Sequence, residues 1–210
     1  MRVNRGELLD VRGTLDVQSG TLSVADGQVT RSWLAQDALA PLAIPLTELR
    51  VWDALGTLLP GTAANDDLAI ITGTFGTDAA RVRTSDAKAS SVTQRGRVLI
   101  PLPPDYDAGE TLTLRVRAGM ITTVADTSAT VDVECYVEDA DGAVGSDICA
   151  TAAQSINSTD KANKDFTITP TGLAPGDVLD VRLTVAIVDS ATGTAVIGEI
   201  SRLALLYDRR

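Results

Sequence analysis

The sequence predicts an all-β protein: a jelly-roll-like antiparallel β-sandwich preceded by an extended, β-rich N-terminal arm. From Leu46 onward, short runs of alternating apolar and polar residues are separated by turns rich in Gly, Asp, Asn, Thr and Pro, a pattern typical of strands. No stretch of ten or more residues has strong 3.6-residue periodicity, so the crossover helices that parallel sheets require are not expected. A chain of 210 residues is long enough for one large all-β domain. We assign residues 1–45 to the arm and its connector, and residues 46–210 to the sandwich.

The arm contains a short repeat in which glycine recurs every seven residues, at Gly6, Gly13 and Gly20. Within a repeat the apolar residues are two apart, which is the period of a β-strand. Three strands of four or five residues bury too little to be stable alone. We therefore expect the arm to pair around a threefold axis or to join the sheet edge of another protein, with a hairpin packed on its own sandwich as the alternative. The candidate partner-binding residues are Leu8, Val11, Leu15, Val17, Leu22 and Val24.

The connector, residues 31–45, combines apolar side chains with two prolines. Ser32 is placed to cap a single helical turn, which Pro41 and Pro45 would end. We expect a connector with an apolar face.

The sandwich sequence contains nine candidate strands. They are Leu49–Trp52, Leu68–Thr72, Gly96–Pro101, Thr111–Ala118, Ser128–Glu138, Val144–Thr151, Lys164–Ile168, Val178–Val188 and Glu199–Tyr207.

Two of these strands have the clearest alternation. In the first, Leu112, Leu114 and Val116 are expected to face the core while the residues between them face outward. In the second, Val178–Val188, the outward face turns apolar at Ala186 and Val188, so we expect another element to cover that end.

Charge and composition exclude several functions. The chain has no histidine, which removes the commonest general base and metal ligand, so we expect neither an enzyme nor a cofactor or metal. A net charge of −10 disfavours nucleic acid as a partner. The chain contains no run of 18 apolar residues, so we expect no membrane span. The first residues lack the apolar region of a signal peptide, so we expect no export by that route.

A turn signal at Asp139–Gly142 predicts a hairpin whose arms carry Cys135 and Cys149 at nearly symmetric positions. A disulfide there would close a loop of about 15 residues. For a protein made in a cytoplasm, we favour two free thiols that pack as small apolar groups.

Acidic clusters suggest weaker alternatives. Calcium could be held near Asp139–Asp147 or at Asn65–Asp67, but the spacing does not fit an EF-hand and turns explain both. An acid pair among Asp105, Asp107 and Glu110 would suit glycoside hydrolysis, although their Pro/Gly-rich loop is typical of an exposed turn.

Aromatic and basic residues give two further interpretations. The chain has few Trp and Tyr residues that could stack on a sugar. We expect one of them, Trp52, to lie in the core. The basic concentrations are Arg81, Arg83, Lys88, Arg95 and Arg97, with Arg209 and Arg210 at the end. They are either solvated or contact an acidic protein surface.

From Leu59 to Val185 the chain resembles a domain of tailed-bacteriophage virion proteins. The segments that carry the resemblance are Gly61–Leu68, Gly73–Thr77, Val98–Pro103, Ala118–Asp126, Gly145–Thr151 and Leu173–Arg182. Members resemble capsid decoration, or cement, proteins: β-sandwiches that sit on the head surface, commonly as trimers. The resemblance implies no catalytic residue.

These observations together predict a virion structural protein. We expect a homotrimer on the outer capsid surface, made in the host cytoplasm, that binds the major capsid protein and clamps neighbouring capsomers. The alternative is a tail- or fibre-associated β-sandwich that binds host carbohydrate.

Overall fold

The computed structural model describes residues 39–123, 128–138, 141–190 and 194–209. The chain divides into two units, Met1–Asp37 and Ala38–Arg210. The first unit lies outside the described residues, as do all six candidate arm residues from Leu8 to Val24 and the predicted cap Ser32.

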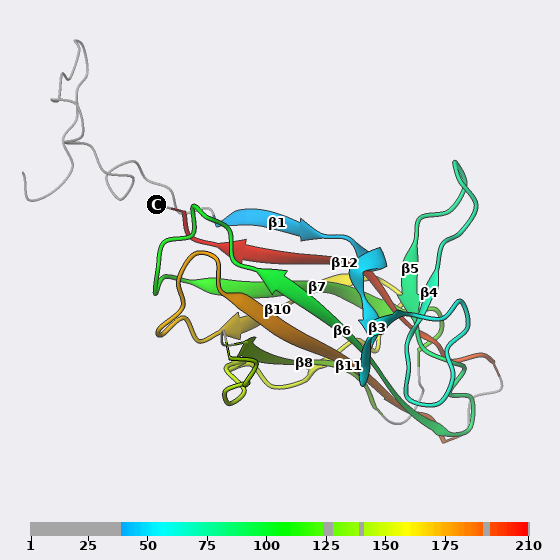
Figure 1. Cartoon of the computed structure of the whole chain (residues 1–210). Helices are drawn as coiled ribbons and strands as arrows, with labels where there is room; N and C mark the ends of the chain where they lie inside the picture. The colour runs from blue at the N-terminus through cyan, green and yellow to red at the C-terminus, as the bar shows by residue number, and fades with distance from the viewer. Residues whose placement is uncertain (1–38, 124–127, 139–140, 191–193, 210) are drawn as a thin grey trace, which may run out of the picture. The chain divides into compact units, whose positions relative to one another are not determined.

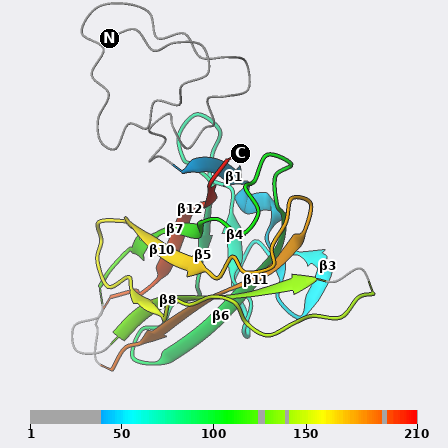
Figure 2. The same ribbon diagram turned by 90° about the vertical axis from the view of Figure 1, so that its left-hand side faces the viewer.

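The described residues form two antiparallel sheets, which confirms the predicted all-β sandwich (Figures 1 and 2). Sheet A has the strand order β10-β7-β12-β5-β4, and β1 also pairs with β12. Its strands are β1 (Ala40–Ile44), β4 (Ala69–Ile71), β5 (Arg81–Arg83), β7 (Leu112–Met120), β10 (Ala162–Ile168) and β12 (Gly198–Tyr207).

Sheet B has the order β3-β2-β6-β11-β8-β9. Its strands are β2 (Arg50–Val51), β3 (Ala54–Leu58), β6 (Ser91–Pro101), β8 (Ser128–Glu138), β9 (Gln154–Ser155) and β11 (Val178–Val188). A short 3-10 helix, η2 (Leu46–Glu48), joins β1 of sheet A to β2 of sheet B. In both ribbon views β6, β8 and β11 form one layer, and β7, β10 and β12 form the other.

The core lies between the two inner faces, where the predicted alternation holds. Leu112, Leu114 and Val116 are fully buried on β7, and the residues between them point outward. On β11, Leu179 and Leu183 are likewise buried. Each such side chain stabilises the fold by about 1.5–3 kcal/mol relative to exposure.

Long strands were predicted better than short ones. The bounds of β8 and β11 match the predictions, whereas β6 begins five residues before the predicted Gly96. Strands β3 and β5, of five and three residues, were missed, because short strands carry too few alternating positions to be recognised.

Two further expectations were wrong, and one further strand was missed. Val144–Thr151 forms no strand and makes only single bridges, at Val144 and Cys149. Val188 is 42% exposed, so among the described residues that end of β11 is not buried as expected. Strand β1, containing Pro41, lies in the segment that we assigned to the connector, and it pairs with β12 from Ala40 to Ile44. Strand pairing in the sandwich therefore begins before residue 46.

Candidate functional site

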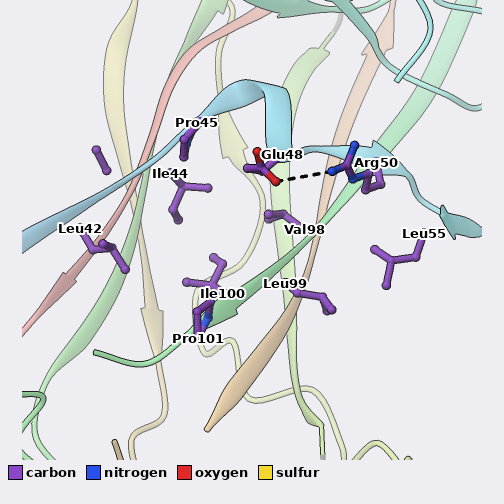
Figure 3. Close-up of a pocket in the computed structure, with 11 residues that line it drawn as sticks. Leu42, Ile44, Pro45, Glu48, Arg50, Leu55, Val98, Leu99, Ile100 and Pro101 are labelled. Atoms are coloured by element: carbon purple, nitrogen blue, oxygen red, sulfur yellow. Dashed lines mark hydrogen bonds and ion pairs between the residues drawn. The ribbon is translucent and has the colours of Figure 1, made fainter. Parts of the chain in front are cut away.

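An apolar groove of about 460 Å³ opens along one flank of the sandwich (Figure 3). Leu42 and Ile44 line it from β1, and Val98 and Ile100 line it from β6. Ile44, Val98 and Ile100 are core residues, exposed by 8% or less, so the groove is a place where the space between the sheets reaches the surface. Leu55 of β3 lines the groove as well.

The groove lies where both sheets end without a covering strand among the described residues. Among the described residues, β1 pairs only with β12. Strand β2 pairs with β6 at a single position, Arg50 with Arg97. The four β6 residues that follow Arg97 pair with β11 on one side, and no described strand pairs with them on the other. An unpaired edge presents backbone donors and acceptors that can bind an added strand.

Leu99 is the best placed residue for such pairing. Arg95 N–H and C=O bond to Asp66 and Leu68 at this edge, and Arg97 pairs with Arg50 there. Since backbone groups alternate sides along a strand, the N–H and C=O of Leu99 also point to the open edge. Its side chain is 36% exposed.

Prolines restrict pairing elsewhere along the groove. Pro45 follows β1 and Pro101 ends β6, and both line the groove. Proline has no N–H and protects sheet edges against indiscriminate pairing. The groove therefore offers apolar contact along its length and backbone bonding at few positions, which favours a specific partner. One end is polar, where the Arg50 guanidinium lies 3.5 Å from Glu48.

A second hollow lies on the outer face of sheet B, around Trp52, and has a volume of about 250 Å³. Trp52 was expected in the core, but it is only half-buried. Its Nε1–H donates to Asp66 Oδ2 at 2.8 Å, and the guanidinium groups of Arg95 and Arg182 lie 5.2 and 5.4 Å from its ring centroid. These cation–π contacts hold the ring against the charged surface of the sheet.

The other residues around this hollow are paired with one another. Arg97 donates twice to Asp180, at 2.6 and 2.5 Å. Arg182 Nε donates to Glu134 at 2.5 Å, and Tyr136 also lines the hollow. One aromatic ring, a phenol and fixed polar groups can together bind a sugar. We call this region the Trp52 surface.

One carboxylate joins the loop after β8 to that strand through hydrogen bonds. Asp147 Oδ1 accepts the backbone N–H groups of Cys135 and Cys149, each at 2.9 Å. Both cysteines are free thiols, Cys135 buried and Cys149 half-buried. Burial raises the pKa of each thiol, and Cys149 and Asp147 add to the effect at Cys135. Gly142 has a φ of +80°, as a tight turn requires.

The other acidic candidates differ in whether their side chains have partners among the described residues. Asp66 contacts Trp52 and Arg95. Asp67 Oδ1 is a buried oxygen without a hydrogen-bond partner, and its pKa is raised by burial and by Asp66 and Asp53.

The loop that carries the suggested acid pair is anchored to the C-terminal strand. Asp105 accepts bonds from Tyr207 at 3.0 Å and Arg209 at 2.6 Å, and the Arg209 bond lowers its pKa. Tyr106 is fully buried, while residues 108–110 of the same loop are exposed as expected.

The predicted basic concentration is split between the two sheets. Arg81 and Arg83 lie on β5 of sheet A and contact the buried carboxylate of Glu199. Arg95 and Arg97 lie on β6 of sheet B and pair with Asp66 and Asp180. Proximity along the chain did not predict proximity in space, because a sandwich sends successive strands to different sheets.

The described residues form neither a metal cluster nor a membrane-spanning helix. No group of three or more Cys, Asp or Glu side chains there is arranged to hold a metal ion. No helix in the described part of the chain has the length and apolarity needed to cross a membrane.

No protein family matches the sequence, and no curated protein sequence matches it. Several solved structures resemble it. The CBM22-1 xylan-binding domain of Xyn10C from Paenibacillus barcinonensis has a TM-score of 0.43 at 11% identity, over 82% of this chain and 97% of that one. A xylan-binding module, CBM15, also has a TM-score of 0.43 at 11% identity, over 82% and 99%. An arabinose-bound α-L-arabinofuranosidase, MgGH51, has a TM-score of 0.43 at 16% identity, over 82% and 27%. Similarity this low does not extend to a shared ligand.

Sequence reasoning missed the groove because it depends on where strands end. Leu55 and Leu99 were not singled out as site residues. One signal was present: Val98, Leu99 and Ile100 form a continuous apolar run, so one of them had to face away from the core.

Proposed function

We propose that this chain is a non-catalytic virion structural protein that attaches to a capsid lattice through its open flank. The observation that carries the proposal is the apolar groove between two unpaired sheet edges. Such a flank suits strand addition, in which main-chain bonds give affinity and apolar pockets give specificity. The virion assignment is supported by the resemblance of Leu59–Val185 to phage virion domains.

The partner in this proposal is the major capsid protein, which would supply an extended apolar segment to the groove. Ile44, Val98 and Ile100 would lose their remaining contact with water when the segment binds, a favourable change of about 25 cal/mol per Å² of apolar surface. A homotrimer would multiply this modest contact through effective concentration. The six arm residues from Leu8 to Val24 remain predicted contacts for trimer formation or capsid binding.

The test is reconstitution on particles from the source that encodes the chain. Particles stripped of the protein are mixed with the wild-type chain or with Leu99→Glu, and bound protein is quantified after sedimentation. The matched control is Leu58→Glu, since Leu58 is 62% exposed but does not line the groove. We expect Leu99→Glu to weaken binding at least tenfold and Leu58→Glu to change it less than twofold. Both variants are first checked for wild-type thermal unfolding.

Three outcomes would overturn parts of the proposal. Equal binding by both variants would show that the groove is not the attachment site. Immunogold labelling of the protein on phage tails would show that it does not belong to the head. A chain without residues 1–30 that still forms trimers and coats heads removes the role of the arm.

Carbohydrate binding at the Trp52 surface is a second candidate function. The observation that favours it is the half-buried indole ring beside Tyr136 and the paired residues Arg97 and Asp180, all lining one hollow. Stacking on the ring and hydrogen bonds to fixed polar groups are the two interactions that sugar recognition needs.

A glycan array tests this candidate directly. The variant is Trp52→Ala, and the control is Phe75→Ala, because Phe75 is fully exposed outside that hollow. We expect Trp52→Ala to abolish binding of any glycan captured by the wild type, with no change for Phe75→Ala. An array with no bound glycan would eliminate the candidate.

A further inference from the structure

Two arginines lie side by side on the outer face of sheet A, and neither has an acidic partner in the part of the chain that the structure describes. Arg117 of β7 and Arg202 of β12 are paired directly across the strands. Both side chains are exposed, and neither makes an ion pair or side-chain hydrogen bond among the described residues. Like charges directly opposite each other in a sheet repel, so the fold gains nothing from this arrangement.

The neighbouring row of the same face shows what a balanced pair looks like. Arg115, two residues before Arg117, lies opposite Asp165 of β10. Two hydrogen bonds join their side chains, at 2.7 and 2.6 Å. The residue of β10 opposite Arg117 is Asn163, which has no charge. The imbalance is therefore confined to one row.

The charge around this row does not compensate for it. Glu199 pairs with Gly119, two residues after Arg117 on β7. Its buried carboxylate already forms ion pairs with Lys161, Arg81 and Arg83. This part of the face thus carries a surplus of positive charge in a chain whose net charge is −10. A local field of opposite sign to the rest of the molecule favours and orients an acidic partner.

The surface here is hollowed and has a cationic end and an apolar end. A concavity of about 640 Å³ is lined by Arg117, Arg202 and Asn163, and also by Ala204, Leu206 and Pro41. Leu206 is four residues from Arg202 along β12, which corresponds to about 13 Å. A register shift between Ile200 and Arg202 marks a bulge at the start of this stretch, and bulges redirect side chains.

We propose that this concavity is a docking surface for an extended segment of a partner protein that carries a carboxylate and, four residues away, an apolar side chain. The carboxylate binds between the guanidinium groups of Arg117 and Arg202 through charge-assisted hydrogen bonds. The apolar side chain lies against Ala204, Leu206 and Pro41. The proposal does not depend on the virion assignment, because this face and the groove can be tested separately.

Fluorescence anisotropy with the full chain tests the proposal. The probe is a labelled, blocked eight-residue peptide of threonine and serine with one glutamate and, four residues later, one leucine. The control peptide has glutamine in place of glutamate. We compare the wild type with Arg117→Gln/Arg202→Gln and with Lys88→Gln/Arg209→Gln. Both double variants lose two positive charges, but only the first alters this face.

We expect the glutamate peptide to bind the wild type and the Lys88/Arg209 variant equally, within twofold. The Arg117/Arg202 variant should bind at least tenfold more weakly, as should the control peptide to the wild type. Binding should weaken as salt rises.

Three results would each overturn the proposal. The first is that the glutamate peptide does not bind the wild type at millimolar concentration. The others are that both peptides bind the wild type equally, or that both double variants lose affinity for the glutamate peptide equally. Inorganic phosphate binding as tightly as the peptide would show a small-anion site only. Self-association in light scattering that Arg117→Gln/Arg202→Gln abolishes would assign the face to a second copy.

Discussion

The outer faces of the two sheets both carry arginines, yet they use them differently. On sheet B, Arg97, Arg182 and Arg95 each have an acidic partner, in Asp180, Glu134 and Asp66. On sheet A, Arg115 is paired with Asp165, whereas Arg117 and Arg202 face each other with no acid paired to either among the described residues. The difference follows from cross-strand register, which decides whether a charge meets its opposite or its like. Paired arginines stabilise the sheet, and unpaired ones are available to a partner.

Glu199→Gln should reduce stability most, because it removes a buried acid that balances the positive charge of sheet A. Glu199 is 1% exposed and contacts Lys161 and Arg83 at 2.6 and 2.5 Å. We expect a loss of about 3 kcal/mol in the free energy of unfolding, measured with urea at pH 7.

The effect should also depend on pH. Burial alone would raise the pKa of Glu199, but the bonds from Lys161 and Arg83 outweigh it and lower the pKa from 4.5. A lowered carboxyl pKa stabilises the fold above the unfolded value, and the contribution is lost as pH falls through the folded value. The wild type and the variant should therefore converge in acid. A constant difference down to pH 2 would contradict the ion-pair explanation.

Asp180→Asn, on sheet B, should cause the next largest loss in the free energy of unfolding. Asp180 is 7% exposed and accepts two bonds from Arg97. We expect a loss of about 2 kcal/mol, as for hydrogen bonds to charged groups, measured by urea unfolding. Asp165→Asn is the control, since its pair with Arg115 is exposed and should contribute about 0.5 kcal/mol. Equal losses at the two sites would contradict the role of burial.

Asp132→Asn should stabilise the protein slightly. Burial raises the pKa of Asp132 above 3.8, and Glu134 and Asp147 add to the effect. A raised carboxyl pKa means that this group favours the fold most below its unfolded pKa and less as pH rises toward the folded value. We expect a gain of about 0.5 kcal/mol at pH 7 and none at pH 3, in thermal unfolding. A loss at pH 7 would show that the charged form is favoured.

Arg117→Gln should change stability least. Any change should be in the opposite direction from that caused by Arg97→Gln. Removing one of two facing like charges should leave stability unchanged or raise it by about 0.3 kcal/mol. The comparison is with Arg97→Gln, which should destabilise the fold, by thermal unfolding at low salt. Destabilisation by both substitutions would mean that Arg117 has a structural role and would weaken the contrast between the faces.

The sequence was informative where a strand is long and one face is buried. The bounds of β8 and β11 were predicted, as was the inward face of β7, because a period of two along ten residues is hard to mistake. Trp52 was misplaced because a lone aromatic residue near a short strand has no alternation to show its face. The predicted hairpin arm Val144–Thr151 failed for a different reason: Asp147 bonds to the backbone of Cys135 and Cys149, and these contacts replace regular strand pairing there.

By itself the amino-acid sequence determined the all-β fold class, the inward-facing residues of the long strands and the acidic net charge, since these depend on neighbours along the chain. Only the tertiary structure decided that Leu42 and Ile44 would lie near Val98 and Ile100 around a groove, and that Arg117 would lie beside Arg202. Both arrangements join residues at least 50 positions apart. They depend on which strands pair, in which register and where each strand ends, and local alternation specifies none of these.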